Sequence, residues 1–423
     1  MKPIVLVATT SLWFPTARLA MALERAGFTV EVVCPPQHPL SKITAVRRAY
    51  TYSGICPIWS IAHALANSRP DLVIPGDDLA TRHLHVLYRQ EHDRGSAGAK
   101  TCRLIERSLG ASESFSVVYE RATFMRIAQE EGVRAPKTAA IDTLDDLRHW
   151  TASMGFPTVL KADGTSGGDG VRVVRSQEEA TSAYRQLNAP PLLARAAKRA
   201  LMNSDKTLIW PSLLRRRSSV SAQTMIAGYE ATSTVACWKG TVLAALHCVV
   251  MNKRYPTGPA TVMRLVDNTE MTSAVEKITR RLSLSGVHGF DFMLEAHTGN
   301  AYLIEINPRA TQVGHLALGR GRDLPAALVA AVTGTEIESG PKVTDRDMVA
   351  LFPQEWMRDA ASPFILSAYH DVPWEEPGLV EACLRHALKQ GSRSSRNLAE
   401  AAVHLRTPNV PMIKVELKES RHE

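Results

Sequence analysis

The sequence predicts a protein of two or three domains, with an α/β part followed by α+β structure. At 423 residues the chain is too long for one ordinary hydrophobic core. Strands alternate with helices over roughly the first 110 residues, which predicts a parallel, Rossmann-like sheet. Val, Ala and Thr dominate residues 220–250, with Gly228 and Gly240 as turn points, a pattern typical of an antiparallel meander.

Composition indicates a folded protein of the cytoplasm. Hydrophobic residues make up 45% and charged residues 22%, with no low-complexity tract. The six cysteines have no CxxC spacing, which favours reduced thiols over a disulfide scaffold or a zinc site. No segment reaches the roughly 18 apolar residues of a membrane span. The first apolar run is too short for a secretory signal. The net charge of +8 indicates a surface for anions, and nucleotides explain it as well as nucleic acids.

The first part of the chain predicts three strands and two helices. The strands are expected at residues 4–9, 29–34 and 71–75, and the helices at 18–27 and 58–66. No GxGxxG follows the first strand, which argues against NAD or FAD.

Further elements follow towards the C-terminus. We expect helices at 112–134, 143–153 and 271–283, strands at 158–161 and 171–174, and a hairpin over 288–306. The last 85 or so residues predict mainly helix and loop, without identifiable chemistry.

A glycine-rich loop joins two of these strands. Lys161 ends the first strand, and Gly164, Gly167, Gly168 and Gly170 follow before the second. Such a loop lets backbone N–H groups approach phosphate oxygens, and the lysine adds positive charge. It differs from a Walker loop, whose lysine follows the glycines and precedes a helix. Taken alone, it is as compatible with a glycine-rich hairpin turn.

The late hairpin predicts a metal site. A turn centred near Thr298 places Asp291 roughly opposite Glu305, and alternation puts Asn307 on the same face. Two facing carboxylates repel, which a bound Mg²⁺ or Mn²⁺ resolves. A solvated outer face is the alternative for an isolated hairpin. The other face is predicted to be apolar and to pack on the core, with these residues: Phe290, Phe292, Leu294, Ile304 and Ile306.

A third segment runs from Val220 to Glu230. A strand that leads into a connection and then an acid can hold an adenine by backbone hydrogen bonds and a ribose by the carboxylate. A core strand with a turn is the alternative.

In this order, the three segments resemble the ATP-grasp superfamily, most closely its carbamoyl-phosphate-synthetase-like branch. The resemblance covers roughly residues 1–335, and Glu305-Ile-Asn307-Pro-Arg309 is its most specific part. It implies an ATP-grasp fold with a Rossmann-like pre-ATP-grasp domain (1–110), a small lobe with the glycine-rich loop (111–190), a large lobe with the metal-binding hairpin (191–335) and a mainly helical C-terminal extension (336–423).

The resemblance also implies a role for individual residues. Lys161, Arg309 and Arg264 would be catalytic, with Lys253 and Arg254 as weaker candidates for the same face. The metal ligands would be Asp291, Glu305 and Asn307. ATP would be bound by Arg121, Lys161, Gly164, Thr165, Ser166, Gly167, Gly168, Gly170, Gln223, Thr224, Met225, Ile226 and Glu230. Two features depart from the family pattern: Gln223 replaces a common carboxylate, and residues 189–219 form an unusually long basic link.

The implied activity is that of an ATP-dependent ligase. A carboxylate attacks the γ-phosphate of Mg·ATP, and an amine or similar nucleophile displaces phosphate from the acyl phosphate. The alternatives are an ATP-grasp carboxylase acting on bicarbonate, a non-catalytic nucleotide sensor, and a nucleic-acid-binding protein using residues 195–217, where aromatic residues are few. The C-terminal segment is expected to cap the fold or to form a homodimer contact. The candidates for acceptor specificity are Asp77, Asp78, His315, Arg320 and Arg322.

Overall fold

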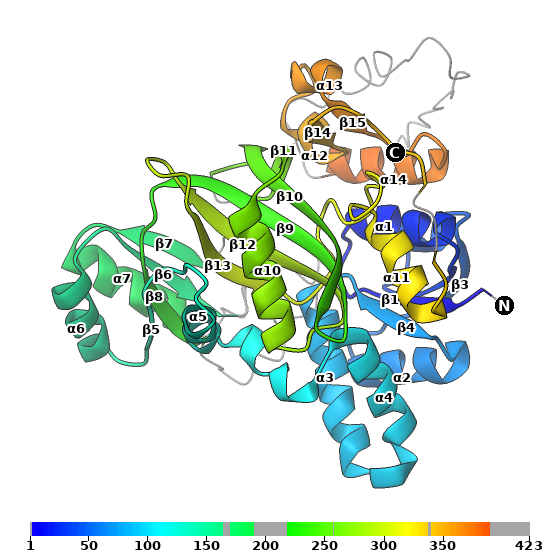
Figure 1. Cartoon of the computed structure of the whole chain (residues 1–423), viewed down its shortest axis with the longest axis horizontal. Helices are drawn as coiled ribbons and strands as arrows, with labels where there is room; N and C mark the ends of the chain where they lie inside the picture. Colours follow the sequence, from blue (N-terminus) through cyan, green and yellow to red (C-terminus); the bar gives the residue numbers. More distant parts are fainter. Residues whose placement is uncertain (1, 164–169, 190–217, 257, 337–339, 390–423) are drawn as a thin grey trace, which may run out of the picture.

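The computed structural model describes residues 2–163, 170–189, 218–256, 258–336 and 340–389 (Figure 1). Within these ranges the strands form three sheets, of four, four and seven strands. No helix of the described chain is long and apolar enough to cross a membrane.

The leading sheet is parallel, as predicted. Its order is β3-β2-β1-β4, and every pairing is parallel. The strands are β1 (Ile4–Ala8), β2 (Thr29–Cys34), β3 (Val46–Thr51) and β4 (Leu72–Pro75), and the helices are α1 (Pro15–Arg25), α2 (Pro57–Ser68), α3 (Asp78–Asp93) and α4 (Ala99–Leu109). Side chains from both faces of β1 are fully buried, as expected for a parallel strand between helical layers. β3 was not predicted; it is an edge strand whose polar sequence VRRAYT leaves most side chains exposed.

The small sheet is antiparallel in the order β5-β8-β6-β7. It contains β5 (Thr138–Ile141), β6 (Thr158–Ala162), β7 (Val171–Val174) and β8 (Val220–Thr224), with α6 (Leu144–Met154) and α7 (Gln177–Asn188) packed against it. The prediction of a single meander over residues 220–250 is wrong. β8 pairs with β5 and β6 of the small sheet, whereas the strand that follows it in the sequence belongs to the seven-stranded sheet. A boundary at residue 190 therefore does not separate the two sheets.

The segment before the small sheet also differs from the prediction. In place of one helix over 112–134, two 3-10 turns, Ser112–Ser114 and Val117–Tyr119, precede α5 (Arg121–Glu130). Serine and β-branched valine are weak helix formers, and they account for the delayed start. Gly132, with φ of +65°, follows the helix end, as the sequence suggested.

The large sheet has the order β13-β12-β9-β10-β11-β14-β15. Its strands are β9 (Gly228–Trp238), β10 (Thr241–Lys253), β11 (Ala260–Val266), β12 (Gly286–Glu295), β13 (Ala301–Asn307), β14 (Met348–Leu351) and β15 (Tyr369–Asp371). Helix α10 (Thr269–Arg281) shares a core with one face. Helix α11 (Leu324–Thr333) shares a core with the other face and with the leading sheet. The small sheet keeps a core of its own.

The C-terminal region is less purely helical than expected. It contributes α12 (Gln354–Arg358), α13 (Phe364–Ser367) and α14 (Pro377–Lys389), but also β14 and β15. β14 pairs with β11 and thereby extends the large sheet. A buried ion-pair cluster ties this region to the leading domain: Asp371 of β15 bonds Arg18 of α1 and, at 2.7 Å, Nε2 of His315.

Candidate functional site

The late hairpin has the predicted register. Asp291 of β12 lies directly opposite Glu305 of β13. Asn307 Nδ2 donates a hydrogen bond to Asp291 Oδ2 at 2.9 Å. Burial, and after it the nearby charge of Glu305, raise the pKa of Asp291 to about 6. The hairpin therefore brings carboxylate and amide oxygens together, and a bound cation would offset the repulsion between Asp291 and Glu305.

A β-bulge changes the apolar face of this hairpin. The register shifts after the Asp291 pair, so that Phe292 lies opposite Leu303. Leu303 is buried with Phe290, whereas Ile304 is only partly buried. The assignment of Ile304 to the core face was therefore wrong, because one extra residue on β13 reverses the alternation beyond it.

Lys161 of β6, in the small sheet, experiences the charges of the acidic pair. Its side chain is buried, with the residue only 7% exposed. Burial, helped by the charge of Arg121, lowers the pKa of Lys161 to about 8 against the opposing effects of Glu305 and Asp291. The charges of both acids therefore act on the lysine, although the three residues were predicted from separate motifs.

Arg121, the first residue of α5, joins the two sheets. Its Nη1 lies 2.7 Å from Asp163 Oδ1, and its Nη2 lies 2.9 Å from Glu305 Oε1. Burial raises the pKa of Asp163, and Arg121 opposes that shift. Asp163 was not among the predicted site residues. The sequence feature that could have indicated Asp163 is its position between Lys161 and Gly164, the first glycine of the loop.

Most of the glycine-rich loop lies outside the described residues: Gly164, Thr165, Ser166, Gly167 and Gly168. Gly170 is described, and its carbonyl oxygen accepts a hydrogen bond from Ala162 N at 2.9 Å. The basic residues from Arg195 to Arg217 lie outside the described ranges as well.

The predicted adenine segment connects the two sheets. β8 ends at Thr224 in the small sheet, and β9 begins at Gly228 in the large sheet. Met225 and Ile226 lie in the connection, and Met225 is exposed. Gln223 is buried and donates a hydrogen bond from Nε2 to Thr138 Oγ1 at 3.0 Å. The side chain of Gln223 therefore serves the small sheet.

Glu230, the expected ribose carboxylate, lies near the start of β9. Its Oε1 is 2.6 Å from Nζ of Lys253 on β10. The pair is partly exposed, which leaves the carboxylate accessible from solvent.

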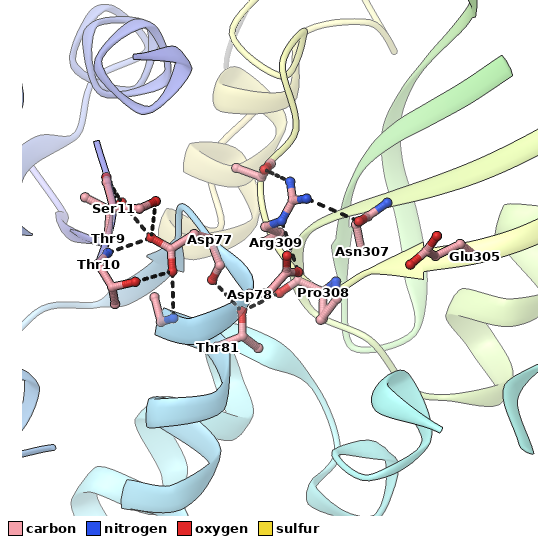
Figure 2. A network of polar contacts seen from close by, with 12 residues as sticks. Thr9, Thr10, Ser11, Asp77, Asp78, Thr81, Glu305, Asn307, Pro308 and Arg309 are labelled. Atoms are coloured by element: carbon pink, nitrogen blue, oxygen red, sulfur yellow. Dashed lines mark hydrogen bonds and ion pairs between the residues drawn. The ribbon is translucent and has the colours of Figure 1, made fainter. Parts of the chain in front are cut away.

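Arg309, two residues after the end of the hairpin, binds the leading domain (Figure 2). Its Nε lies 3.0 Å from Asp78 Oδ1, and its Nη2 donates to Asn307 Oδ1 at 3.3 Å. Thr81 Oγ1 donates to Pro308 O at 2.7 Å. The hairpin end is thus fastened to the first turn of α3.

Asp77 fixes that turn of α3 (Figure 2). It is the N-cap, accepting from Ala80 N at 2.9 Å. It also accepts hydrogen bonds from Thr9 Oγ1 at 2.7 Å and from Thr10 N at 2.6 Å. Asp77 was predicted to be a specificity residue, but its carboxylate already accepts hydrogen bonds from residues of the leading domain. Its neighbour Asp78 instead forms an ion pair with Arg309.

Arg264 does not join the site. The residues paired in succession across the sheet from Asp291 are Thr232, Cys248 and Leu265, which share its face. Arg264, next to Leu265 on β11, points to the opposite face. Its assignment as a catalytic residue is therefore corrected.

The other basic candidates near the hairpin also have local partners. His315 bonds Asp371 in the buried cluster. Arg322 pairs with Asp267, and Arg320 lies 3.7 Å from Glu336 on an exposed surface.

The described residues contain no group of three or more His, Cys, Asp or Glu placed to hold a metal ion. The hairpin instead offers two acids and one amide. That donor set fits Mg²⁺ or Mn²⁺, which bind through one or two carboxylates, waters and substrate phosphates.

Residues 120–319 match the family described as "Carbamoyl-phosphate synthase L chain, ATP binding domain". The carbamoyl phosphate synthase large chain of Myxococcus xanthus is 24% identical over 336 residues, covering 78% of this chain and 28% of that one. A Thermus thermophilus protein of the same name is 22% identical over 357 residues, covering 83% and 32%. The chain thus spans about a third of the length of these relatives.

Solved structures show the same fold at lower identity. The biotin carboxylase domain of the Hydrogenobacter thermophilus 2-oxoglutarate carboxylase has a TM-score of 0.56 at 16% identity, covering 80% of this chain and 71% of that one. The N5-carboxyaminoimidazole synthetase of Staphylococcus aureus has a TM-score of 0.53 at 14% identity, covering 79% and 78%. Together these comparisons lead to one conclusion: residues 120–319 are similar to the ATP binding domain of the carbamoyl phosphate synthase large chain, and the chain shares the fold of the biotin carboxylase domain and of N5-carboxyaminoimidazole synthetase.

Proposed function

We propose that this protein is an ATP-dependent ligase that activates a carboxylate as an acyl phosphate and joins it to an amine or a similar nucleophile. The observation that carries the proposal is that Arg121 bridges Asp163, next to the small sheet, and Glu305 of the large sheet, while the charges of Glu305 and Asp291 act on the buried Lys161. A nucleotide with its metal is the kind of ligand that such opposed charges accommodate.

ATP would lie between the two sheets. Its adenine would meet the connection at Met225 and Ile226, with Gln223 and Thr224 at the strand end, and its ribose would meet Glu230. The phosphates would meet Arg121, Lys161 and the loop of Gly164, Thr165, Ser166, Gly167, Gly168 and Gly170. Binding requires Arg121 to exchange its bond to Glu305 for phosphate, and Glu230 to share or release Lys253.

Asp291, Glu305 and Asn307 would hold Mg²⁺ or Mn²⁺. When bound, the ion supplies charge neutralisation at the β- and γ-phosphates. The elevated pKa of Asp291 supports this role, because a bound cation favours the ionised form that burial opposes.

In the first step a carboxylate oxygen attacks the γ-phosphorus, the bond to the bridging oxygen breaks, and ADP leaves. In the second step the nucleophile attacks the acyl carbon, and inorganic phosphate leaves. Lys161 and Arg309 act by positioning and by neutralising charge on the transferring group, so no covalent protein nucleophile is needed.

The domain assignment follows from this proposal. Residues 1–110 would be the Rossmann-like pre-ATP-grasp domain, 111–190 with β8 the small lobe, 191–335 without β8 the large lobe, and 336–423 the C-terminal extension. All six cysteines are free thiols, which supports a place in the cytoplasm. A homodimer contact through the C-terminal extension is a separate question for solution measurements.

Bicarbonate is the second candidate substrate. One of the structural relatives was solved with MgADP and bicarbonate, which makes bicarbonate a reasonable acid to test here. Bicarbonate would be activated by the same attack on the γ-phosphate, so it belongs in the same screen.

The test is ADP release from Mg·ATP in the presence of pooled amino acids, small carboxylic acids and bicarbonate, with mass spectrometry of the product. We expect Lys161→Met to lower ADP release about 100-fold or more, since it removes a charge aimed at the phosphates. Arg264→Gln is the matched control on the other face of the sheet, expected to stay within about twofold of wild type. A folded wild type that neither binds Mg·ATP nor releases ADP with any acid contradicts the proposal.

A further inference from the structure

Arg82 of α3 is a cation at the junction of the site for which the structure shows no acidic partner. Its guanidinium carbon lies 4.5 Å from the centroid of the Tyr119 ring, and the side chain is half-buried. Nearby arginines are matched to acids: Arg121 bonds Asp163 and Glu305, and Arg309 bonds Asp78. In the described part of the chain, Arg82 forms no ion pair with any acid.

The position of Arg82 is fixed by the helix that carries the Asp78–Arg309 contact. Asp78 and Arg82 are four residues apart on α3, so they lie on one face about 6 Å apart along the axis. Tyr119 lies two residues before Arg121 in sequence. Arg82 therefore stands beside both arms of the site, the end of the metal hairpin and the start of α5.

Tyr119 is itself held in place. Its hydroxyl lies 3.1 Å from Nδ1 of His85, and the His85 ring stacks on Phe115 with centroids 3.8 Å apart. A guanidinium that lies over an aromatic ring is held by its flat face, and its N–H groups remain available at the edge. That arrangement suits an oxyanion, to which arginine donates charge-assisted hydrogen bonds.

The charge of Arg82 reaches the phosphate end of the site. Burial raises the pKa of Asp163, and both Arg121 and Arg82 oppose that rise. A half-buried cation without an acid is costly, and an anionic ligand would offset that cost.

We propose that Arg82 binds the carboxylate that the enzyme activates. One carboxylate oxygen accepts hydrogen bonds from Arg82, and the other is directed at the γ-phosphorus beside Arg309. The substrate class is accordingly a carboxylic acid recognised through its reacting carboxylate on the leading-domain side. This inference rests on the proposed ligase function.

The test uses the full chain with hydroxylamine as the nucleophile. The acids are bicarbonate, acetate, succinate and the twenty amino acids, each supplied separately with Mg·ATP. A carboxylate oxygen displaces ADP from ATP, and the hydroxylamine nitrogen then displaces phosphate from the acyl carbon, leaving a hydroxamate that mass spectrometry identifies. Variants are compared by KM for the reactive acid and KM for Mg·ATP. Binding of Mg·ADP, followed as a thermal shift, confirms folding.

We expect Arg82→Gln to raise KM for the acid about 10- to 100-fold, the loss expected for charge-assisted hydrogen bonds, with KM for Mg·ATP unchanged. Arg82→Lys should recover part of that loss. Tyr119→Phe, which keeps the ring, should match wild type, whereas Tyr119→Leu should raise KM for the acid. Arg89→Gln is the control, since it removes the same charge from an exposed position two turns further along α3.

Three outcomes decide between the two proposals. Suppose that the wild type yields a hydroxamate. If Arg82→Gln then leaves KM for the acid unchanged, or raises KM for Mg·ATP as much as KM for the acid, only the role of Arg82 is overturned. An effect of Arg89→Gln equal to that of Arg82→Gln has the same consequence. A wild type that binds Mg·ADP but yields no hydroxamate from any acid overturns the ligase, and the substrate site with it.

Discussion

The buried ion-pair cluster around Asp371 gives a prediction whose size follows from the structure. Asp371 is 2% exposed and accepts bonds from Arg18, itself 7% exposed, and from His315. Asp371→Asn keeps the shape of the side chain but removes its charge, so that Arg18 is left with Glu375, which lies at 3.5 Å and is half exposed. Breaking a buried pair from one side typically costs about 3–5 kcal/mol.

The pKa of Asp371 gives a second, independent magnitude. The charges of His315 and Arg18 outweigh burial and lower it from 3.8 to about 2. Such a shift corresponds to roughly 2 kcal/mol in favour of the ionised form. Because the folded pKa lies below the unfolded value, this stabilisation is fully present above about pH 4 and is lost as the pH falls through about 2. We therefore expect Asp371→Asn to lower the free energy of unfolding by about 2–4 kcal/mol at pH 7.

The assay is urea unfolding at pH 7, followed by tryptophan fluorescence. Arg25→Gln is the control, because the Arg25–Glu375 pair lies 3.2 Å apart at the exposed edge of the same cluster and should contribute less than about 1 kcal/mol. If Asp371→Asn unfolds within about 0.5 kcal/mol of wild type, or Arg25→Gln costs as much, the reasoning from burial is refuted.

Further predictions concern the hairpin and the thiols. A Cβ on Gly289 would lie 2.3 Å from Thr311 Cγ2, so Gly289→Ala should destabilise the protein by about 1–3 kcal/mol in urea unfolding. In Gly378→Ala the new Cβ meets nothing within 4 Å, so equal destabilisation there would remove the steric explanation. Glu305→Gln should lower the rate of ADP release about 100-fold with little change in urea midpoint; an unchanged rate would argue against a metal ligand here. Brief iodoacetamide treatment of the native protein should label Cys56, the only exposed thiol of the six, and mass spectrometry showing equal labelling of the other five would contradict their burial.

Local features of the site could be predicted from the sequence. The pairing of Asp291 with Glu305 followed from a short turn and from alternation along two adjacent strands, which are properties of neighbouring residues. The parallel leading sheet likewise followed from the order of its strands and helices. The expectation that Lys161 joins the same site came only from the family resemblance, since its strand lies in another sheet.

Other features of the site could not be predicted in this way. The bulge that turns Ile304 from the core is one inserted residue, invisible in the pattern of hydrophobic residues. The direction of Arg264 depends on register across four strands. The bridge from Arg121 to Glu305 spans 184 positions in the sequence.

The division of the hydrophobic cores has a mechanical consequence. One core is shared by the leading sheet, one face of the large sheet and the C-terminal helices, whereas the small sheet packs around its own apolar centre. If the small sheet rotated as one body against the leading and large sheets, the apolar contacts inside each body would be kept. Polar bonds between the bodies, such as that of Arg121 to Glu305, would break. Opening and closing around a nucleotide can thus proceed as a hinge motion without melting either body.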